Sequence, residues 1–278
     1  MKEKPFSKYQ ILANAVMIIW TLAIILPFIL LFMSSITDEN TLVANGYSFF
    51  PKKFSLASYS YIIKSGGQIL KAYGVSIGVT VVGTLLNVLL SALMAFPLSV
   101  KNLPGRNVMM FFVFFTMLFN GGIVPSYIMW TGTFHIKDTI FAQLLPNFLL
   151  SAWNVMMIRT YFTTSIPDGL YEAAEIDGAS QFTIFWKIVL PLGKPILVTM
   201  GTFAGLAYWN DWTNGLYYIV KNTGLYNVQN LLNQMVQNIR FLTQSSNSNV
   251  TAAASTIPAT GIQMAIAFVA ILPIMLIF

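Results

Sequence analysis

The stretch that decides the architecture is Tyr171-Glu-Ala-Ala-Glu-Ile-Asp-Gly178, followed at a short distance by Ile188-Val-Leu-Pro191. This polar stretch lies between two long apolar blocks of the chain. Ala173 and Ala174 leave a thin surface where another backbone can approach closely. Its carboxylates, which are available to basic partners, belong to Glu172, Glu175 and Asp177. On its residues alone, the stretch is either a docking segment for a partner protein or an ordinary connection between membrane spans.

Signals for helix ends surround this stretch. Ser165 and Asp168 have the three-residue spacing of a capping box at the start of a helix. Gly178 suits the left-handed conformation that ends a helix, and Ser180 is a suitable cap for a second helix. Proline lacks the N–H that a helix interior needs, so the second helix is expected to end before Pro191. The sequence therefore predicts a helix, a sharp turn and another helix.

The composition is that of an integral membrane protein. Of the 278 residues, 56% are hydrophobic and only 9% are charged, which is far from the usual balance of a soluble domain. Several charge-free runs reach the roughly 20 apolar residues that a spanning helix needs. The net charge of +6 is spread over the polar segments. It favours contact with anionic lipid rather than with nucleic acid.

The apolar runs predict an all-α, polytopic membrane protein with six transmembrane helices. The predicted spans are 11–33, 72–100, 107–130, 139–158, 195–219 and 257–278. Residues 1–10 form the N-terminus, 11–278 the transmembrane domain, 34–71 and 220–256 the long outer loops, and 165–191 the polar helix–turn–helix segment. Basic residues before the first span, at positions 2, 4 and 8, place the N-terminus in the cytoplasm. Alternation of the spans then puts the 165–191 segment in the cytoplasm as well.

Small residues recur at four-residue spacing in two of the predicted spans. Gly74 with Gly78, and Gly201 with Gly205, form G-x-x-x-G faces that let helices pack closely in lipid. Asn120-Gly-Gly-Ile-Val-Pro125 predicts a break in the third span. Broken backbone at membrane depth is tolerated where protein or water satisfies its polar groups. This break is therefore either the lining of a cavity or a plain proline kink.

Trp209-Asn210-Asp211-Trp212 is the most unusual sequence within the predicted spans. Asp211 is the one acidic residue inside a span, and an ionisable group at membrane depth indicates function. Sugar rings stack their apolar faces on indole rings and bond their hydroxyls to amide and carboxyl groups. These four residues, together with Asn120, are our candidates for a substrate pathway. The alternative is a tryptophan belt at the outer interface with a solvated Asp211.

The outer loop 220–256 divides into two halves. Residues 228–242 have apolar side chains at helical spacing, which predicts an amphipathic surface helix. Residues 243–249 are Thr, Gln, Ser and Asn only. This half has too little apolar surface to predict a packed element.

Several classes of site are missing from the sequence. There is no cysteine, and the single His135 has no catalytic partner nearby. Gly193-Lys194 lacks the upstream glycine of a phosphate-binding loop, so the chain is expected not to hydrolyse ATP. We expect no metal and no cofactor on this chain. A membrane-embedded enzyme would need several converging ionisable groups, and only Asp211 qualifies; a stand-alone channel is a further alternative.

The residues Glu172-Ala173-Ala174, Gly178, Ile188, Leu190 and Pro191 closely resemble the EAA signature of the membrane subunits of bacterial ABC importers. The resemblance implies the type I ABC importer permease fold, in which this segment is a cytoplasmic coupling helix that docks in a groove of an ATP-hydrolysing subunit. It implies a polar contact from Glu172, a close-packed face at Ala173 and Ala174, and a turn at Gly178. The coupling residues it assigns are Glu172, Ala173, Ala174, Asp177, Gly178, Ile188, Leu190 and Pro191.

The resemblance extends over nearly the whole chain and narrows the function. Asn210-Asp-Trp212 and the Gly121-Gly122…Pro125 segment are similar to the maltose-type carbohydrate branch, especially to members that import complex oligosaccharides. This implies passage of an oligosaccharide from an extracytoplasmic binding protein, which the 220–256 loop contacts, across a bacterial cytoplasmic membrane. The implied partners are a second, homologous membrane subunit and two ATP-binding cassette subunits, which hold the ATP and Mg²⁺. An importer of an amino acid, polyol or glycerol phosphate is the alternative.

Overall fold

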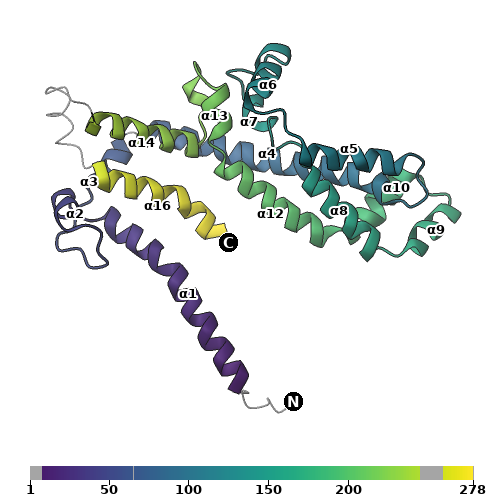
Figure 1. Cartoon of the computed structure of the whole chain (residues 1–278), viewed down its shortest axis with the longest axis horizontal. Helices are drawn as coiled ribbons and strands as arrows, with labels where there is room; N and C mark the ends of the chain where they lie inside the picture. The colour runs from purple at the N-terminus through teal and green to yellow at the C-terminus, as the bar shows by residue number, and fades with distance from the viewer. Residues whose placement is uncertain (1–7, 65, 245–258, 278) are drawn as a thin grey trace. The chain divides into compact units, whose positions relative to one another are not determined.

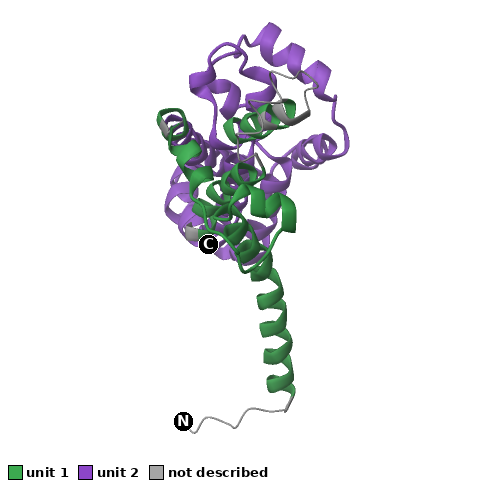
Figure 2. Cartoon of the chain, turned by 90° about the vertical axis from the view of Figure 1, so that its left-hand side faces the viewer, with its two compact units in different colours: residues 1–70, 231–278 green, residues 71–230 purple. Residues whose placement is uncertain are grey.

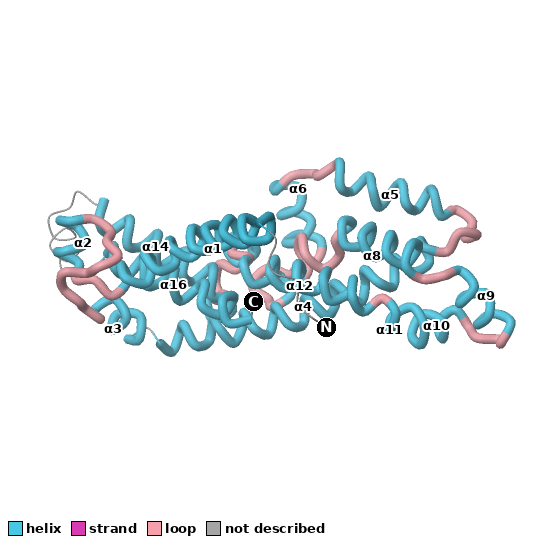
Figure 3. The backbone as a smooth tube through the Cα atoms, turned by 90° about the horizontal axis from the view of Figure 1, so that it is seen from below, coloured by secondary structure: helices cyan, strands magenta, loops and turns pink. Residues whose placement is uncertain are grey.

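The computed structural model describes residues 8–64, 66–244 and 259–277. Within these ranges the chain is built of helices joined by loops (Figure 3), and the one β-bridge is an isolated pair of residues, Thr37 and Phe54. The predicted all-α class is confirmed. The chain divides into two compact units, residues 1–70 with 231–278 and residues 71–230 (Figure 2).

The first unit is built around two apolar helices from opposite ends of the chain. These are α1 (Lys8–Ser35) and α16 (Ala259–Ile277), and the rings of Phe32 and Phe268 pack between them in a tilted arrangement with centroids 5.0 Å apart. The polar segment after α1 contains α2 (Glu39–Asn45) and α3 (Ala57–Lys64), and both contact α16. Most side chains of α1 are exposed and apolar. A helix that is apolar all round is suited to a lipid environment.

One carboxylate fixes the start of α16. The two oxygens of Glu39 accept hydrogen bonds from the backbone N–H groups of Thr260 and Gly261, each at 2.8 Å. A carboxylate stabilises a helix N-terminus because it satisfies free N–H groups and opposes the helix dipole. Gly261 allows this approach, since a Cβ there would lie 3.1 Å from Glu39 Oε2 and 2.5 Å from Ser58 Oγ.

The second unit contains a hydrophobic core of buried side chains. Its elements are α4 (Gly66–Ser99, from residue 71 on), α5 (Arg106–Leu118), α6 (Ile123–Ile128), α7 (Phe141–Leu144), α8 (Ala152–Ser165), α9 (Asp168–Ile176), α10 (Gln181–Ile184), α11 (Leu190–Leu192), α12 (Lys194–Asn210) and α13 (Thr213–Tyr218). The core contains the fully buried side chains of Ala92, Ile158, Phe162 and Val189. In Figure 1, α9 and α10 lie at one end of this unit.

The predicted spans correspond to helices of unequal regularity. Two helices are long and apolar enough to cross a membrane by themselves, residues 9–35 and 67–99. Two more candidates are bent pairs, 106–118 with 123–133 at 111° and 181–192 with 194–210 at 78°. The apolar helix at 260–275 is shorter, and the predicted start of the sixth span at residue 257 lies outside the described residues. These helices do not by themselves establish the predicted count of six.

Two of the predicted spans, the fifth and the fourth, are not single continuous helices in the structure. The fifth, predicted as 195–219, ends as a helix at Asn210 and is followed by the separate α13. The fourth, predicted as 139–158, is not one helix: only α7 and the start of α8 are helical, and residues 145–151 between them are not. The third breaks between α5 and α6, where Asn120 and its neighbouring glycines predict a break.

The two G-x-x-x-G faces have different surroundings. A Cβ at Gly201 would lie 3.4 Å from Val88, and one at Gly205 would lie 3.4 Å from Thr84 Oγ1, so this face packs closely on α4. A Cβ at Gly74 or Gly78 would meet no atom within 4 Å. The prediction of helix packing is therefore confirmed for α12, whereas the glycine face of α4 is open among the described residues.

The polar loop between α13 and α16 begins with a long helix. α14 (Val228–Gln244) covers the predicted amphipathic segment, and its side chains at Leu231 and Leu232 are buried. The polar run predicted at 243–249 lies outside the described residues from position 245 on.

Candidate functional site

Two parts of the 71–230 unit have the chemistry of a functional site: the helix–turn–helix segment at 165–191 and a polar pocket between α4, α8 and α12. In the first, α9 ends in a Schellman turn. The N–H of Ala179 donates to the carbonyl of Ala174 at 2.9 Å, and that of Gly178 donates to Glu175 at 3.0 Å. Gly178 has φ +77°, the left-handed conformation predicted for it. The turn is therefore a fixed geometry rather than a loose loop.

The two alanines of this segment face different surroundings. Ala174 is buried in the core of its own unit, and the Tyr171 ring stacks on Phe96 with a centroid distance of 6.5 Å. Ala173 and Glu172 are exposed. Ala173 therefore faces outward and Ala174 faces the core of its own unit, because α9 needs an apolar side toward that core.

The outer face of the segment is apolar as well as acidic. Ile176 is 86% exposed and Phe182 is 67% exposed, and they lie on either side of the Gly178 turn. Asp177 is also exposed. Exposed large apolar side chains beside a rigid turn are typical of a protein docking surface. The residues predicted for coupling did not include Ile176 and Phe182, although both flank the turn closely in sequence.

The segment is anchored at both ends. Lys101 forms an ion pair with Asp168 at the start of α9, at 2.5 Å between Nζ and Oδ2. Ser180 accepts the N–H of Thr183 at 3.2 Å, which confirms the predicted cap of α10. Ile188 and Leu190 pack against the core. These contacts hold the turn in a defined place on the unit.

Two local predictions about this segment are wrong. Ser165 is the last residue of α8 and Pro167 precedes α9 without a side-chain cap, so Ser165 and Asp168 form no capping box. The second helix also does not stop before Pro191. The helix continues through a π-helical turn at Phe185–Val189 into α11. Pro191 lies in the first turn of α11, where its missing N–H has no cost.

The break in the fourth span is stabilised by side chains from other helices. Asn87 of α4 donates its Nδ2 to the carbonyl of Phe148 at 2.6 Å. The Tyr208 hydroxyl of α12 donates to the carbonyl of Leu144 at 2.9 Å. Asn214 of α13 donates to the carbonyl of Pro146 at 3.1 Å. Backbone carbonyls that a helix would have satisfied are thus satisfied by three neighbouring helices, as required at membrane depth.

Beside this break lies a pocket of about 280 Å³. Its polar groups are amides and a hydroxyl, from Asn87, Asn147, Ser151 and Asn154. Its rings are those of Phe148, Phe203 and Tyr208. Asn154 Nδ2 donates to Asn87 Oδ1 at 2.7 Å, which fixes the orientation of both amides. The lining combines these polar groups with a larger apolar surface, and it includes no charged side chain.

The sequence contains a signal for this pocket that the prediction did not use. Asn87 and Asn154 lie within predicted spans, are nearly fully buried, and are polar residues at membrane depth. A rule restricted to ionisable groups selects Asp211 and leaves these amides aside. The residues that complete the pocket come from distant parts of the chain, which no local pattern indicates.

The candidate residues at 209–212 occupy a folded turn rather than this pocket. Asp211 is buried, and its Oδ1 accepts hydrogen bonds from Thr213 N at 3.0 Å, Thr213 Oγ1 at 2.8 Å and Asn214 N at 3.2 Å. Its backbone carbonyl accepts Asn227 Nδ2. Asp211 is therefore a cap for α13, and the structure gives it a local role that was not predicted.

The neighbours of Asp211 and the residue Asn120 differ in exposure. Trp209 is 7% exposed, whereas Trp212 is 43% exposed and Asn210 is exposed at the end of α12. Asn120 is exposed, and its Oδ1 accepts the N–H of Gly122 at 2.8 Å within the break of the third span. Among these candidates, Asn210, Trp212 and Asn120 are accessible to a solute.

Interrupted helices, a polar pocket beside one interruption and a rigid helix–turn–helix at one end define the class of this chain as a membrane subunit of a transporter. Residues 72–278 match the family of binding-protein-dependent transport system inner membrane components, and the chain belongs to this family. Members are transport subunits and not enzymes. The chain is therefore membrane-embedded, and its fold is that of an ABC importer permease.

Similar proteins support this assignment over almost the full length. The chain is 35% identical to "Protein LplC" of Bacillus subtilis over 254 residues, 91% of this chain and 83% of that protein. It is 34% identical over 270 residues to the "Polygalacturonan/rhamnogalacturonan transport system permease protein YtcP" of the same organism, which covers 97% of this chain and 92% of that one. Among solved structures, a bacterial ABC transporter "involved in the import of the acidic polysaccharide alginate" is similar with a TM-score of 0.80 and 25% identity, covering 99% of this chain and 97% of the other.

Proposed function

We propose that this chain is the membrane subunit through which an ATP-driven importer passes a carbohydrate, and more narrowly an oligosaccharide, into the cytoplasm. The observation that supports a sugar is the pocket beside the broken fourth span. Neutral amides and hydroxyls bond to sugar hydroxyls in either direction, and aromatic rings stack on the apolar faces of a sugar ring. The names of YtcP and of the alginate importer, which refer to polysaccharides, point to the same class.

The path we propose runs past the open end of this pocket. Phe203 is 56% exposed and Asn147 is exposed, so both can meet a passing solute. Asn210 and Trp212 are accessible and extend the path, and Asn120 is a further candidate on the break of the third span. We assign the buried Asp211 to holding the turn before α13 rather than to contact with the sugar.

The partners we propose follow from the segment at 165–191. Glu172, Ala173, Asp177 and Ile176 form its exposed face, and we propose that this face docks on an ATP-binding cassette subunit. Ile188 and Leu190 fix the segment to its own unit, so a displacement of the docked face is passed to the core. ATP and Mg²⁺ bind to the partner subunits, and this chain holds no cofactor. ATP binding shifts the equilibrium because the closed ATPase pair binds one membrane conformation more tightly.

The remaining parts of the proposed importer are a second, homologous membrane subunit and an extracytoplasmic solute-binding protein. We propose that the loop at 220–256 contacts the binding protein. In this arrangement the N-terminus and the 165–191 segment are cytoplasmic, and the membrane is a bacterial cytoplasmic membrane.

The first experiment tests the substrate class. The complex that co-purifies with the tagged chain is placed in liposomes with its binding protein, and ATP-dependent uptake is measured for neutral oligosaccharides, uronic-acid oligosaccharides, amino acids, polyols and glycerol phosphate. We expect uptake of one of the two oligosaccharide classes. Uptake restricted to a non-carbohydrate would contradict the proposal, as would isolation of the chain without an ATPase subunit.

A substitution in the pocket tests the site. Phe203→Ala removes one ring, and loss of stacking on the order of 1 kcal/mol predicts uptake reduced about fivefold at low substrate. Phe111→Ala is the matched control, because Phe111 is 59% exposed on α5 and does not line the pocket. Equal uptake by both variants would remove Phe203 from the path.

The docking face has its own test. Ile176→Asp places a charge on a side chain that is 86% exposed, so the fold should be unaffected, but binding of the ATPase subunit should fall at least tenfold. Ile63→Asp, at a position 73% exposed on α3, is the control and should leave ATPase binding unchanged. Retention of the ATPase by Ile176→Asp would show that the dock lies elsewhere.

A further inference from the structure

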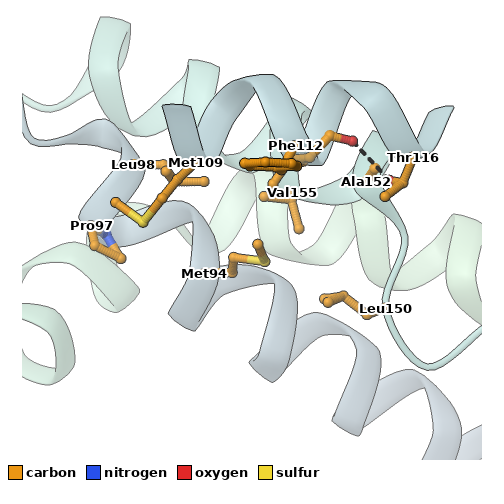
Figure 4. A pocket seen from close by; sticks show the side chains of 10 residues that line it. Met94, Pro97, Leu98, Met109, Phe112, Thr116, Leu150, Ala152 and Val155 are labelled. Carbon is orange, nitrogen blue, oxygen red and sulfur yellow. Dashed lines mark hydrogen bonds between the residues drawn. The ribbon is translucent and has the colours of Figure 1, made fainter. Parts of the chain in front are cut away.

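A second cavity of this unit has a character unlike that of the polar pocket. It lies between α4, α5 and α8 (Figure 4) and has a volume of about 490 Å³. Met94 and Leu98 of α4, Met109 and Phe112 of α5, and Val155 of α8 contribute to its wall. Met109 is 41% exposed and Phe112 is 61% exposed, so the cavity is open on the α5 side. Its volume is within the roughly 300–1,000 Å³ typical of sites for small molecules.

The interior of this cavity offers nothing to a polar ligand. The one hydroxyl in its wall belongs to Thr116, and that hydroxyl donates to the carbonyl of Val113 at 2.8 Å within its own helix, as the dashed line in Figure 4 shows. The other side chains of the wall are apolar. Whatever occupies this space should therefore be hydrocarbon at that depth.

Two arginines lie where α4 ends, next to this cavity. Arg159 Nε donates to the carbonyl of Leu98 at 3.2 Å, and the side chain of Leu98 is part of the cavity wall. Arg106 begins α5 one turn before Met109, and its Nη1 donates to the carbonyl of Val100 at 3.5 Å. The two arginines therefore bond carbonyls only two residues apart, which places both side chains at the same end of α4. Both side chains are partly buried.

These two positive charges have no carboxylate partner in the part of the chain that the structure describes. The ion pairs there are Lys53 with Asp38 and Lys101 with Asp168, so the nearest lysine in sequence, Lys101, is already paired. Neighbouring guanidinium groups repel each other and are costly to bury without an anion. The planar N–H donors of arginine fit the oxygens of a phosphate in bidentate fashion.

We propose that the cavity and the Arg106–Arg159 pair form a binding site for one anionic phospholipid. An acyl chain fills the apolar cavity, and the phosphate accepts hydrogen bonds from both guanidinium groups. Basic pockets between membrane helices recognise anionic lipid headgroups in this way. A helix of a partner subunit would also cover the cavity, but an apolar helix would leave both arginines without an anion. The charge pair therefore favours a lipid over a protein occupant.

Native mass spectrometry of the complex purified with this chain tests the proposal. The complex is extracted in mild detergent and exposed to equal amounts of phosphatidylglycerol and phosphatidylcholine. We expect one phosphatidylglycerol retained per chain, preferred over phosphatidylcholine by about tenfold or more. Arg106→Gln combined with Arg159→Gln should abolish that preference. The control, Lys187→Gln with Lys194→Gln, removes the same charge from exposed positions and should keep it.

A further variant separates lipid binding from folding, because Arg159 also holds the end of α4. Met109→Trp narrows the cavity and leaves both arginines in place, so retention of phosphatidylglycerol should fall severalfold while the complex stays assembled. Equal retention of the two lipids by the natural chain would overturn the proposal, because it would show that the cavity binds acyl chains without selecting the headgroup. A preference that survives both the arginine and the Met109 variants would also overturn it and assign the lipid to another surface.

Discussion

The closest approach of α4 to α12 provides the sharpest test of how the membrane unit is packed. Gly83 of α4 faces Tyr208 of α12, and a Cβ at position 83 would overlap three atoms of the tyrosine ring, two of them at 2.6 and 2.7 Å. Tyr208 is 2% exposed, its ring packs on Phe148 at 5.3 Å, and its hydroxyl holds the carbonyl of Leu144. Gly83→Ala must therefore displace a buried ring that supports the broken span.

The size of this effect follows from three contributions. Overpacking costs about 1–3 kcal/mol, and loss of the Tyr208 hydrogen bond adds about 0.5–1.5 kcal/mol. The better helix propensity of alanine returns about 0.5–1 kcal/mol. The net loss is about 2 kcal/mol in the free energy of unfolding, which corresponds to a midpoint of thermal unfolding lower by roughly 5 °C.

The assay compares Gly83→Ala with Gly78→Ala, the same change on the same helix. Thermal unfolding is followed in detergent by the loss of the monodisperse peak in size-exclusion chromatography, and uptake is measured on the same samples. Gly78 has open space around it, so its alanine variant should be as stable as the natural chain or up to about 1 kcal/mol more stable. Equal stability of the two variants would refute the close approach of Tyr208 to α4.

Three further predictions concern local features. Gly178→Asp forces a β-carbon into a left-handed turn at a cost of about 1 kcal/mol, so we expect the complex to assemble while ATP hydrolysis no longer drives uptake; normal uptake would contradict the coupling role. Glu39→Ala should lower the free energy of unfolding by about 1–2 kcal/mol in chemical denaturation, whereas Asp38→Ala, which breaks a 3.7 Å ion pair with the largely exposed Lys53, should change it by less than about 1 kcal/mol. The N–H of Lys221, with those of its two neighbours, holds the pKa of Asp138 below its usual range, so the tie between Asp138 and residues 220–222 contributes fully above the ordinary carboxyl pKa and is lost as the pH falls through the lowered value. Hydrogen exchange at 220–222, corrected for intrinsic rates, should therefore stay slow at pH 5 and become fast only as the pH falls below about 4, and loss of protection at pH 5 would contradict this.

In the coupling segment, two predictions that depend only on neighbouring residues were confirmed. Gly178 and Ser180 adopt the conformations predicted for them because a left-handed turn and a helix cap involve only neighbouring residues. The capping box at Ser165 failed because Pro167 forces the preceding Ile166 into extended backbone, φ −104° and ψ 116°, so α8 ends before α9 begins. The proline rule prevailed over the serine spacing.

The prediction missed the break in the fourth span, although Pro146 followed by Asn147 is a local signal for a helix break. Residues 145–151 are mostly apolar and read as part of a continuous helix by hydropathy. The groups that stabilise the break, on Asn87, Tyr208 and Asn214, lie 61 to 68 positions away from the carbonyls they satisfy. The pocket next to the break was missed because the rule applied was restricted to ionisable groups and left aside the buried amides of Asn87 and Asn154.

Asp211 has a local structural role that the sequence analysis did not predict. A carboxylate at membrane depth indicates function in general, and that rule led us to place it on the substrate path. Thr213, two residues later, could have suggested the alternative, since an aspartate often bonds the backbone two residues on and begins a turn. The structure shows that bond, at 3.0 Å.

The bonds across the interrupted fourth span have a mechanical consequence. A helix that satisfies its own backbone can slide or tilt past its neighbours at the cost of side-chain packing alone. Here the carbonyls of Leu144, Pro146 and Phe148 are held by α12, α13 and α4, so displacing any one of these helices would strand a buried carbonyl. The three helices are therefore hydrogen-bonded to the segment between them and should move together as one rigid body. Any hinge of a transport cycle should then lie outside this group of helices.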